Sequence, residues 1–115
     1  LVEFVDIYPT LLDLAGITPQ NKGLQGTSFK ILLQRPRTLW KKAAFSRYGP
    51  AISAITPKFN YVQYKSGEKM LFDLISDPDE NINIAGDSKR KSTLNHHSKI
   101  LKDGWSAALP PSLQK

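Results

Sequence analysis

The chain of 115 residues contains no cysteine, so it can form no disulfide, no thiolate metal site and no cysteine nucleophile. It also has no apolar run close to the roughly 20 residues that a membrane-spanning helix requires, so we predict no membrane partner. Its glycines are scattered, which excludes a glycine-rich phosphate loop. These absences remove several classes of catalytic and nucleotide-binding site and leave the compartment open.

Acidic residues are missing from a long central segment. No aspartate or glutamate occurs between Asp13 and Glu68, whereas nine basic residues fall inside, and the formal net charge of the chain is +6. An uninterrupted positive surface raises the local concentration of anionic partners, and a solvated basic face gives the same pattern. We therefore expect either a surface that binds an anionic partner or a solvated basic face. The nine residues are Lys22, Lys30, Arg35, Arg37, Lys41, Lys42, Arg47, Lys58 and Lys65.

Few residues are placed for catalysis or metal binding. His96 and His97 are adjacent, and no Asp, Glu or Cys stands three or four residues away to complete a metal site on a helix. We predict that both histidines face solvent. The stretch SDPDEN, residues 76–81, lacks the glycine and glutamate positions of an EF-hand loop and predicts an Asp-Pro turn with side-chain capping. We therefore predict no catalytic residue and no metal ligand in this chain.

The stretch VEFVDIYPTLLDLAG, residues 2–16, predicts a helix that ends at Gly16. Asp6 is expected to cap it by accepting a backbone N–H from the first turn, and Pro9 fits the third helical position, where the missing donor has no partner. The helix carries an apolar stripe whose covering partner is expected upstream, outside this chain. The stripe consists of Ile7, Leu11 and Leu14.

The middle of the chain has the pattern of a small antiparallel sheet. Short segments rich in aromatic and branched residues are separated by turn signals, and one face of the resulting meander is more apolar and requires a cover. The predicted strands are residues 40–48, 51–56, 60–64 and 69–74. Their order predicts four consecutive antiparallel strands.

The last third of the chain predicts the covering helix. It begins at Asp87 or Ser88 as N-cap and runs to about Ala108, where Pro110 and the proline after it prevent continuation. Leu94, Leu101, Trp105 and Ala108 return to one face of this helix. We therefore predict the α+β class, with a four-stranded antiparallel sheet packed by a C-terminal helix.

Basic residues interleaved with aromatic residues on predicted strands also suggest a nucleic-acid-binding module. The predicted order of helix, four strands and helix differs from the alternating order of the common RNA-recognition sheet, so nucleic acid is disfavoured as a partner. A structural module with no ligand of its own is a third alternative. The aromatic residues are Phe45, Tyr48, Phe59, Tyr61 and Tyr64.

Five segments together resemble the C-terminal portion of type I sulfatases, which belong to the alkaline-phosphatase-like superfamily. The order and spacing are similar to those of the bacterial group around iduronate-2-sulfatase. The most specific pieces have the patterns VD-x-x-PTLLDLAG and L-x-DL-x-x-DP-x-E-x-x-N. The segments are VEFVDIYPTLLDLAG, LQGTSF, WKKAAFSRY, MLFDLISDPDENINIAG and LKDGWSAALPP.

The resemblance implies that residues 1–35 are the tail of a large α/β catalytic domain and that residues 36–115 are the C-terminal subdomain. The parent chain would hydrolyse sulfate esters of carbohydrates with a formylglycine, made in a C/S-x-P-x-R motif, and a calcium ion. The nearest approach here, SDPDE at residues 76–80, has Glu80 where arginine is required. The resemblance therefore implies that this chain alone is inactive and that its partner is the missing catalytic domain.

The resemblance also implies a periplasmic or secreted parent, and an exposed stripe that could support a dimer. The first strand of the subdomain would approach the active-site mouth and aim Arg47 or Tyr48 at a sulfated sugar; the alternative is that Arg47 is simply an exposed strand residue. Relatives carry S-I-R-T in the second strand, whereas this chain has SAIT at residues 53–56, with Ile55 in place of the arginine. Specificity for iduronate is therefore not implied.

Overall fold

The computed structural model describes residues 1–20 and 23–113 of the chain. Two compact units can be distinguished, one formed by Val2–Trp40 and one that begins at Lys41. None of the helices in the described part is long and apolar enough to cross a membrane. The predicted division into residues 1–35 and 36–115 refers to the domains of a longer protein and stays a prediction.

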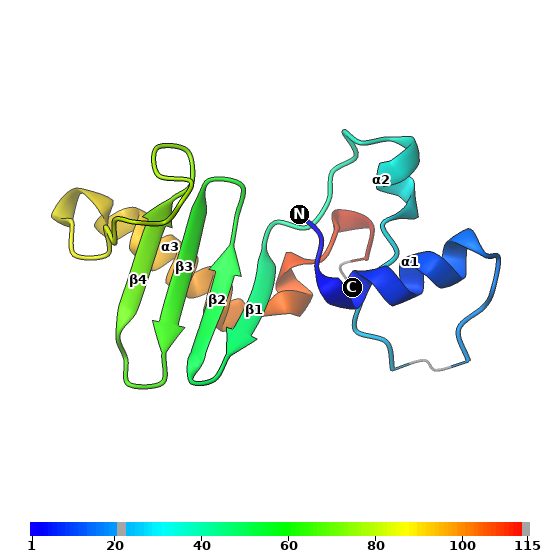
Figure 1. Cartoon of the computed structure of the whole chain (residues 1–115), viewed down its shortest axis with the longest axis horizontal. Helices are drawn as coiled ribbons and strands as arrows, with labels where there is room; N and C mark the ends of the chain where they lie inside the picture. The colour runs from blue at the N-terminus through cyan, green and yellow to red at the C-terminus, as the bar shows by residue number, and fades with distance from the viewer. Residues whose placement is uncertain (21–22, 114–115) are drawn as a thin grey trace. The chain divides into compact units, whose positions relative to one another are not determined.

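The first unit contains α1 (Ile7–Leu14), which follows a short 3-10 turn, and α2 (Lys30–Gln34) (Figure 1). Pro9 is the third residue of α1, as predicted. The helix ends where Gly16 adopts a positive φ of 70°, and the amide of Ile17 donates to the carbonyl of Leu12 over 2.9 Å. This arrangement satisfies a terminal carbonyl that the helix itself leaves free.

Asp6 is fully buried, but the prediction that it caps α1 is wrong, because its side chain accepts no hydrogen bond from the first turn of that helix. Its Oδ2 accepts the amide of Glu3 at 2.9 Å, and its Oδ1 accepts the amide of Thr27 at 2.8 Å. A carboxylate can hold two backbone donors at once. Asp6 therefore holds a distant loop and the 3-10 turn before α1, and does not cap α1 itself.

Gly26 lies beside that anchor. A Cβ atom on Gly26 would stand 1.8 Å from the carbonyl oxygen of Val5, so only glycine allows the two backbone segments to approach this closely. The loop is tied a second time at Asp13, which accepts hydrogen bonds from the Ser28 hydroxyl at 2.6 Å and the Lys30 ammonium at 3.0 Å. These two donors hold the pKa of Asp13 below its ordinary value.

The apolar stripe of α1 is solvent-exposed. Ile7, Leu11 and Leu14 are 42%, 59% and 51% exposed. Burying such side chains stabilises a protein by about 1.5–3 kcal/mol each. Covering the stripe with another apolar surface would therefore stabilise the chain.

The second unit is built on the predicted four-stranded antiparallel sheet. Its strands are consecutive, in the order β1-β2-β3-β4, and they pair in register, with Ala54 opposite Tyr61 and Tyr61 opposite Leu71. These three side chains are fully buried. Because they share one face of the sheet, they form its core. The strands are β1 (Ala44–Tyr48), β2 (Ala51–Ile55), β3 (Phe59–Tyr64) and β4 (Lys69–Asp73).

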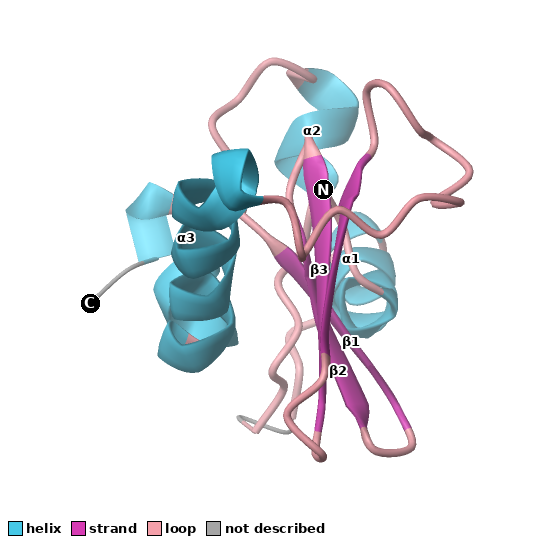
Figure 2. Cartoon of the chain, turned by 90° about the vertical axis from the view of Figure 1, so that its left-hand side faces the viewer, coloured by secondary structure: helices cyan, strands magenta, loops and turns pink. Residues whose placement is uncertain are grey.

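The helix α3 (Lys91–Asp103) lies against one face of this sheet, which Figure 2 shows nearly edge-on. The ring of Phe59 on β3 meets the ring of His97 on α3 with 5.2 Å between centroids, so α3 covers the face that also carries Tyr61. The α+β class, the four-stranded sheet and the covering helix are therefore confirmed.

The first strand begins four residues later than predicted. The last pair between β1 and β2 joins Ala44 to Ile55, after which β2 turns away, so residues 40–43 have no strand to pair with. Lys42 instead donates its amide to the carbonyl of Ala108 at 3.0 Å, beyond the end of α3. This bond places Lys42 beside the C-terminal segment.

The covering helix is shorter than predicted. Asp87 caps the 3-10 turn that leads into α3, because its side chain accepts the amide of Lys89 at 2.9 Å. The helix then ends at Asp103, since Gly104 adopts a positive φ of 79°, and a separate 3-10 turn follows over Trp105–Ala108. The predicted continuation to Ala108 is therefore wrong, because Gly104 interrupts it.

The segment after β4 folds back along that strand. The Asp77 side chain accepts the amides of Asn81 at 3.1 Å and Ile82 at 2.8 Å, which confirms the predicted Asp-Pro turn with side-chain capping and lowers the pKa of Asp77. The turn returns the chain so that the amide of Ile84 donates to Leu71 at 2.9 Å. The outer backbone groups of the edge strand are thereby partly satisfied.

Candidate functional site

Arg47 and Tyr48, the predicted substrate-binding residues, are the last two residues of β1. Arg47 is exposed, and Tyr48 is 89% exposed at the tip of the β1–β2 hairpin. Successive residues of a strand point to opposite faces, so Arg47 shares the face covered by α3 and Tyr48 does not. The structure therefore places the two side chains on different sides of the sheet.

Ile55, which the resemblance aligns with an arginine, lies at the other end of the sheet from Arg47. It pairs with Ala44 on one side and Asn60 on the other, and it is half-buried. An isoleucine there packs within the sheet and offers no donor to an anion. The position thus supplies packing in this chain.

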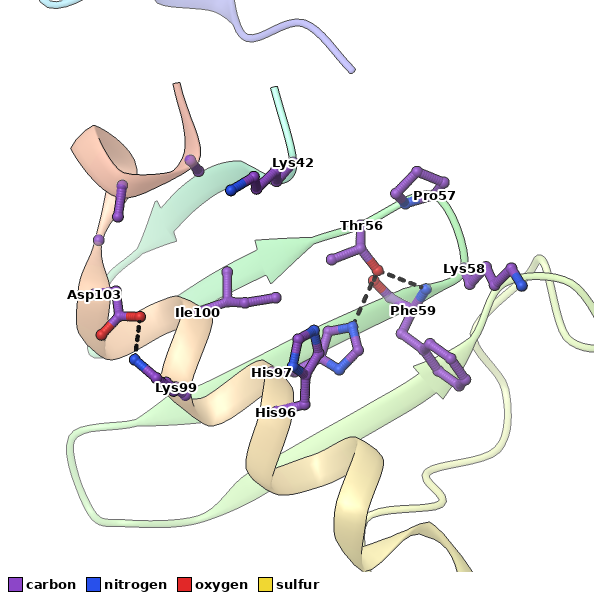
Figure 3. Close-up of a pocket in the computed structure, with 13 residues that line it drawn as sticks. Lys42, Thr56, Pro57, Lys58, Phe59, His96, His97, Lys99, Ile100 and Asp103 are labelled. Atoms are coloured by element: carbon purple, nitrogen blue, oxygen red, sulfur yellow. Dashed lines mark hydrogen bonds and ion pairs between the residues drawn. The ribbon is translucent and has the colours of Figure 1, made fainter. Parts of the chain in front are cut away.

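A cavity of 660 Å³ opens between α3 and the turn that joins β2 to β3 (Figure 3). Its walls come from three places: Lys42 before β1, the turn itself, and the second half of α3 with the residues that follow. Pockets for small organic ligands commonly have volumes of about 300–1,000 Å³. The cavity therefore has the size of a site for one sugar ring or a similar molecule.

His97 forms the back of this cavity and is only 4% exposed, so the prediction that both histidines face solvent is wrong for His97 and correct for His96. Its Nδ1 lies 2.8 Å from the carbonyl of Thr93, and its Nε2 lies 3.1 Å from the hydroxyl of Thr56. A carbonyl only accepts, so Nδ1 carries a proton and the neutral ring accepts the Thr56 hydroxyl at Nε2.

Burial and the neighbouring His96 lower the pKa of His97, with burial the larger cause, while the hydrogen bond to the Thr93 carbonyl raises it. The net shift favours the neutral ring. Leu94, His97 and Leu101 follow each other at spacings of three and four. This helical spacing places His97 on the apolar face of α3. The sequence therefore contained a signal for the burial of His97, which the adjacency of two histidines obscured.

The rim of the cavity carries more positive than negative charge. Lys42 and Lys58 are exposed, and Lys99 pairs with Asp103, the only acid among the lining residues, over 2.6 Å. Exposed pairs of this kind contribute only about 0.3–0.5 kcal/mol on a helix. The floor between these charges is apolar and comes from Pro57, Phe59 and Ile100.

The five aromatic residues that suggested base stacking differ in exposure: Tyr48 is exposed, and the other four are half-buried or buried. Tyr61 is fully buried, and its hydroxyl donates to Gln63 at 2.9 Å. Phe59 is flanked by the His97 ring and by the Arg90 guanidinium, which lies 5.9 Å from its centroid. A stacking platform requires exposed ring faces. The geometry therefore counts against single-stranded nucleic acid on this face of the sheet.

The residues present do not fit the cofactors that the resemblance implies for the parent chain. Within residues 1–20 and 23–113, no group of three or more His, Asp or Glu side chains is placed to hold a metal ion. The SDPDE stretch is a turn whose Asp77 carboxylate is occupied by backbone amides. The described part of the chain thus offers no calcium cage, and the sequence contains no formylglycine motif.

Residues 1–105 match the family described as N-sulphoglucosamine sulphohydrolase, C-terminal. A sulfatase from Formosa agariphila is 34% identical over 81% of this chain and 18% of its own length. Arylsulfatase K from Gallus gallus is 36% identical over 89% of this chain and 22% of its own length. The chain therefore belongs to this C-terminal sulfatase family and spans about a fifth of the curated relatives it matches.

Two solved structures have folds similar to that of this chain. BT4656, determined in complex with its substrate D-glucosamine-2-N,6-O-disulfate, is 25% identical and superposes with a TM-score of 0.76 over 85% of this chain and 22% of that chain. A phosphonate monoester hydrolase from Agrobacterium radiobacter is 26% identical, with a TM-score of 0.68 over 85% and 23% of the two chains. In each case the similarity involves less than a quarter of the longer chain.

Proposed function

We propose that this chain is the C-terminal part of a sulfatase that hydrolyses sulfate esters of carbohydrates, and that the chain by itself is inactive. The observation that carries the proposal is the family match over residues 1–105, together with a fold shared with BT4656, whose structure holds a sulfated glucosamine as its substrate. The formylglycine and the calcium ion belong to the parent chain in this proposal. No catalytic step is assigned to residues of this chain.

The proposed substrate is an anionic, sulfated carbohydrate. The central segment without acidic residues supports an anionic ligand, because a positive field raises its local concentration. We keep the iduronate-2-sulfatase-like group as the proposed subgroup on the strength of the five segments. Ile55 replaces the arginine of relatives, so the sugar itself need not be iduronate.

The proposed role of this chain is to form part of the wall of the substrate cleft. Arg47 is the stronger candidate of the two predicted residues, because a guanidinium offers a planar fork of donors that matches sulfate or carboxylate oxygens. Tyr48 offers one hydroxyl on the other side of the sheet. A single sugar unit would therefore contact one of these side chains directly.

The proposed partner of the first unit is the missing catalytic domain. Ile7, Leu11 and Leu14 form an exposed stripe on α1, and the relatives are about four times as long as this chain. We propose that the stripe packs against the rest of the parent, and that it supports self-association when the chain is alone. A periplasmic or secreted location of the parent belongs to the same proposal.

Two other functions are less well supported. A nucleic-acid module is disfavoured because Tyr61 is fully buried and the order of the elements differs from that of the common RNA-recognition sheet. A structural module with no ligand contact of its own would have the same fold. It differs from our proposal in that Arg47 would not contact the substrate. Experiments on Arg47 therefore decide between a cleft wall and a structural module.

The experiment uses the complete parent protein and compares kcat/KM for D-glucosamine-2-N,6-O-disulfate. Arg47→Ala is expected to lower kcat/KM at least tenfold, and Arg47→Lys should recover part of it, because charge remains but the fork is lost. Arg37→Ala, an exposed arginine of the first unit, is the matched control and should change kcat/KM less than twofold. Equal kcat/KM values for Arg47→Ala and the control would favour the structural module over the cleft wall.

A further inference from the structure

We propose that the cavity between α3 and the β2–β3 turn binds one sulfated sugar unit, as a second saccharide contact of this chain. The inference rests on the proposed function for the class of ligand. It differs in place, because the cavity lies where β1 begins and Arg47 lies near the end of that strand. The three residue steps of extended strand from Ala44, where β1 begins, to Arg47 span about 10 Å.

The floor of the cavity suits the apolar face of a sugar ring. Pro57, Phe59 and Ile100 contribute apolar surface between the turn and α3, and the volume of 660 Å³ exceeds what a bare inorganic anion fills. Binding sites for small molecules are mostly apolar, with a few polar groups that fix orientation. The cavity has both components.

The rim suits a sulfate group. The ammonium groups of Lys42 and Lys58 have no side-chain partner in the described residues, and the exposed His96 ring adds a nitrogen on the opposite wall. Figure 3 shows Lys42 on the segment before β1 and Lys58 on the turn, with Lys58 extending outward, and the labelled α3 residues below them in this view. Charge-assisted hydrogen bonds from ammonium groups to an anionic oxygen are roughly twice as strong as neutral ones.

The back wall is fixed before any ligand arrives. The Thr56 hydroxyl contacts Nε2 of His97 and accepts the amide of Phe59 at 3.1 Å, so the turn and α3 are held together behind the cavity. A preformed wall lowers the ordering cost of binding. The cavity therefore does not depend on closure of a loop around the sugar.

Titration of the isotopically labelled chain with D-glucosamine-2-N,6-O-disulfate tests this inference by ¹⁵N-¹H correlation spectra. We expect saturable shifts of the Phe59 and Ile100 amides and weak or absent shifts with unsulfated glucosamine. Lys42→Gln combined with Lys58→Gln should weaken binding at least tenfold. Lys65→Gln combined with Lys69→Gln removes the same charge from exposed positions outside the cavity and should change affinity less than twofold.

The inference is overturned by the absence of a shift at Phe59 or Ile100, by equal weakening of binding in the two double variants, or by equal binding of unsulfated glucosamine. A random oligonucleotide that displaces the sugar from the same amides would also overturn it, in favour of a nucleic-acid site. Failure of the proposed function has a different signature, because it appears in the sulfatase activity of the complete parent and in its Arg47→Ala variant. Each hypothesis can therefore fail without the other.

Discussion

The Nε2 atom of His97 lies 3.1 Å from the hydroxyl of Thr56, and this contact joins α3 to the turn between β2 and β3. Both residues are buried. The same hydroxyl accepts the amide of Phe59 at 3.1 Å. The Thr56 hydroxyl thus provides a hydrogen-bond partner both for the turn and for the covering helix.

Thr56→Val should destabilise the chain by about 1–3 kcal/mol, because it leaves the buried Nε2 of His97 and the amide of Phe59 without their partner. Chemical denaturation measures the change in the free energy of unfolding. Thr38→Val is the control, since the Thr38 hydroxyl donates to Arg35 at an exposed site, and it should cost less than about 0.5 kcal/mol. Equal costs for the two variants would contradict the role of Thr56.

The lowered pKa of His97 predicts a dependence of stability on pH. The unfolded chain has the ordinary pKa of 6.5 and takes up a proton at a higher pH than the folded chain does. The contribution of neutral His97 is therefore fully present above that pH and is lost progressively as the pH falls towards the lower pKa of the folded state.

Denaturation at a series of pH values measures this loss. His97→Gln should flatten the dependence of the free energy of unfolding on pH as the pH falls below 6.5, whereas the exposed His96→Gln should leave it largely unchanged. If His96→Gln flattened the curve and His97→Gln did not, the assignment of the buried ring would be wrong.

Gly26→Ala should destabilise the first unit by at least about 1–3 kcal/mol, because its Cβ would stand 1.8 Å from the Val5 carbonyl oxygen and would force the loop away from Asp6. Gly86→Ala is the matched control: no atom lies within 4 Å of its added Cβ. Thermal unfolding of the two variants compares them directly. A neutral Gly26→Ala would show that the loop does not approach Val5 as closely as described.

The exposed stripe on α1 predicts that the chain alone self-associates at high concentration. Leu11→Glu places a charge in the middle of the stripe and should shift the chain towards monomer in sedimentation velocity. Ile75→Glu changes a side chain that is 70% exposed outside the stripe and should leave the association as it is. A wild-type chain that stays monomeric throughout would remove the proposed self-association.

The sequence predicted the sheet well because its signals are local. Alternating side chains and turn residues such as Gly49 and Gly67, both with positive φ, define the hairpins within a few residues. The start of β1 could not be read in this way, since it depends on where β2 ends and on the distant bond from Lys42 to Ala108. Long-range partners decide such boundaries.

Polar groups with long-range partners were the main source of error. Asp6 precedes a helix and has the composition of an N-cap, yet it holds the amide of Thr27, 21 residues away. His97 looked like half of an exposed pair, although its partner Thr56 is 41 residues away. The cavity that His97 and Thr56 close at the back is formed by the turn and α3 together. No single stretch of sequence therefore reveals it.

Sulfate release from 4-nitrophenyl sulfate and D-glucosamine-2-N,6-O-disulfate, by the complete parent and by this chain alone, tests the central claim most directly. The account predicts release by the parent from at least one of the two esters and none by the chain, because the chain offers neither a formylglycine sequence nor, in its described residues, a metal-binding cluster. Release by the chain alone, or a parent that cleaves neither ester, would contradict it.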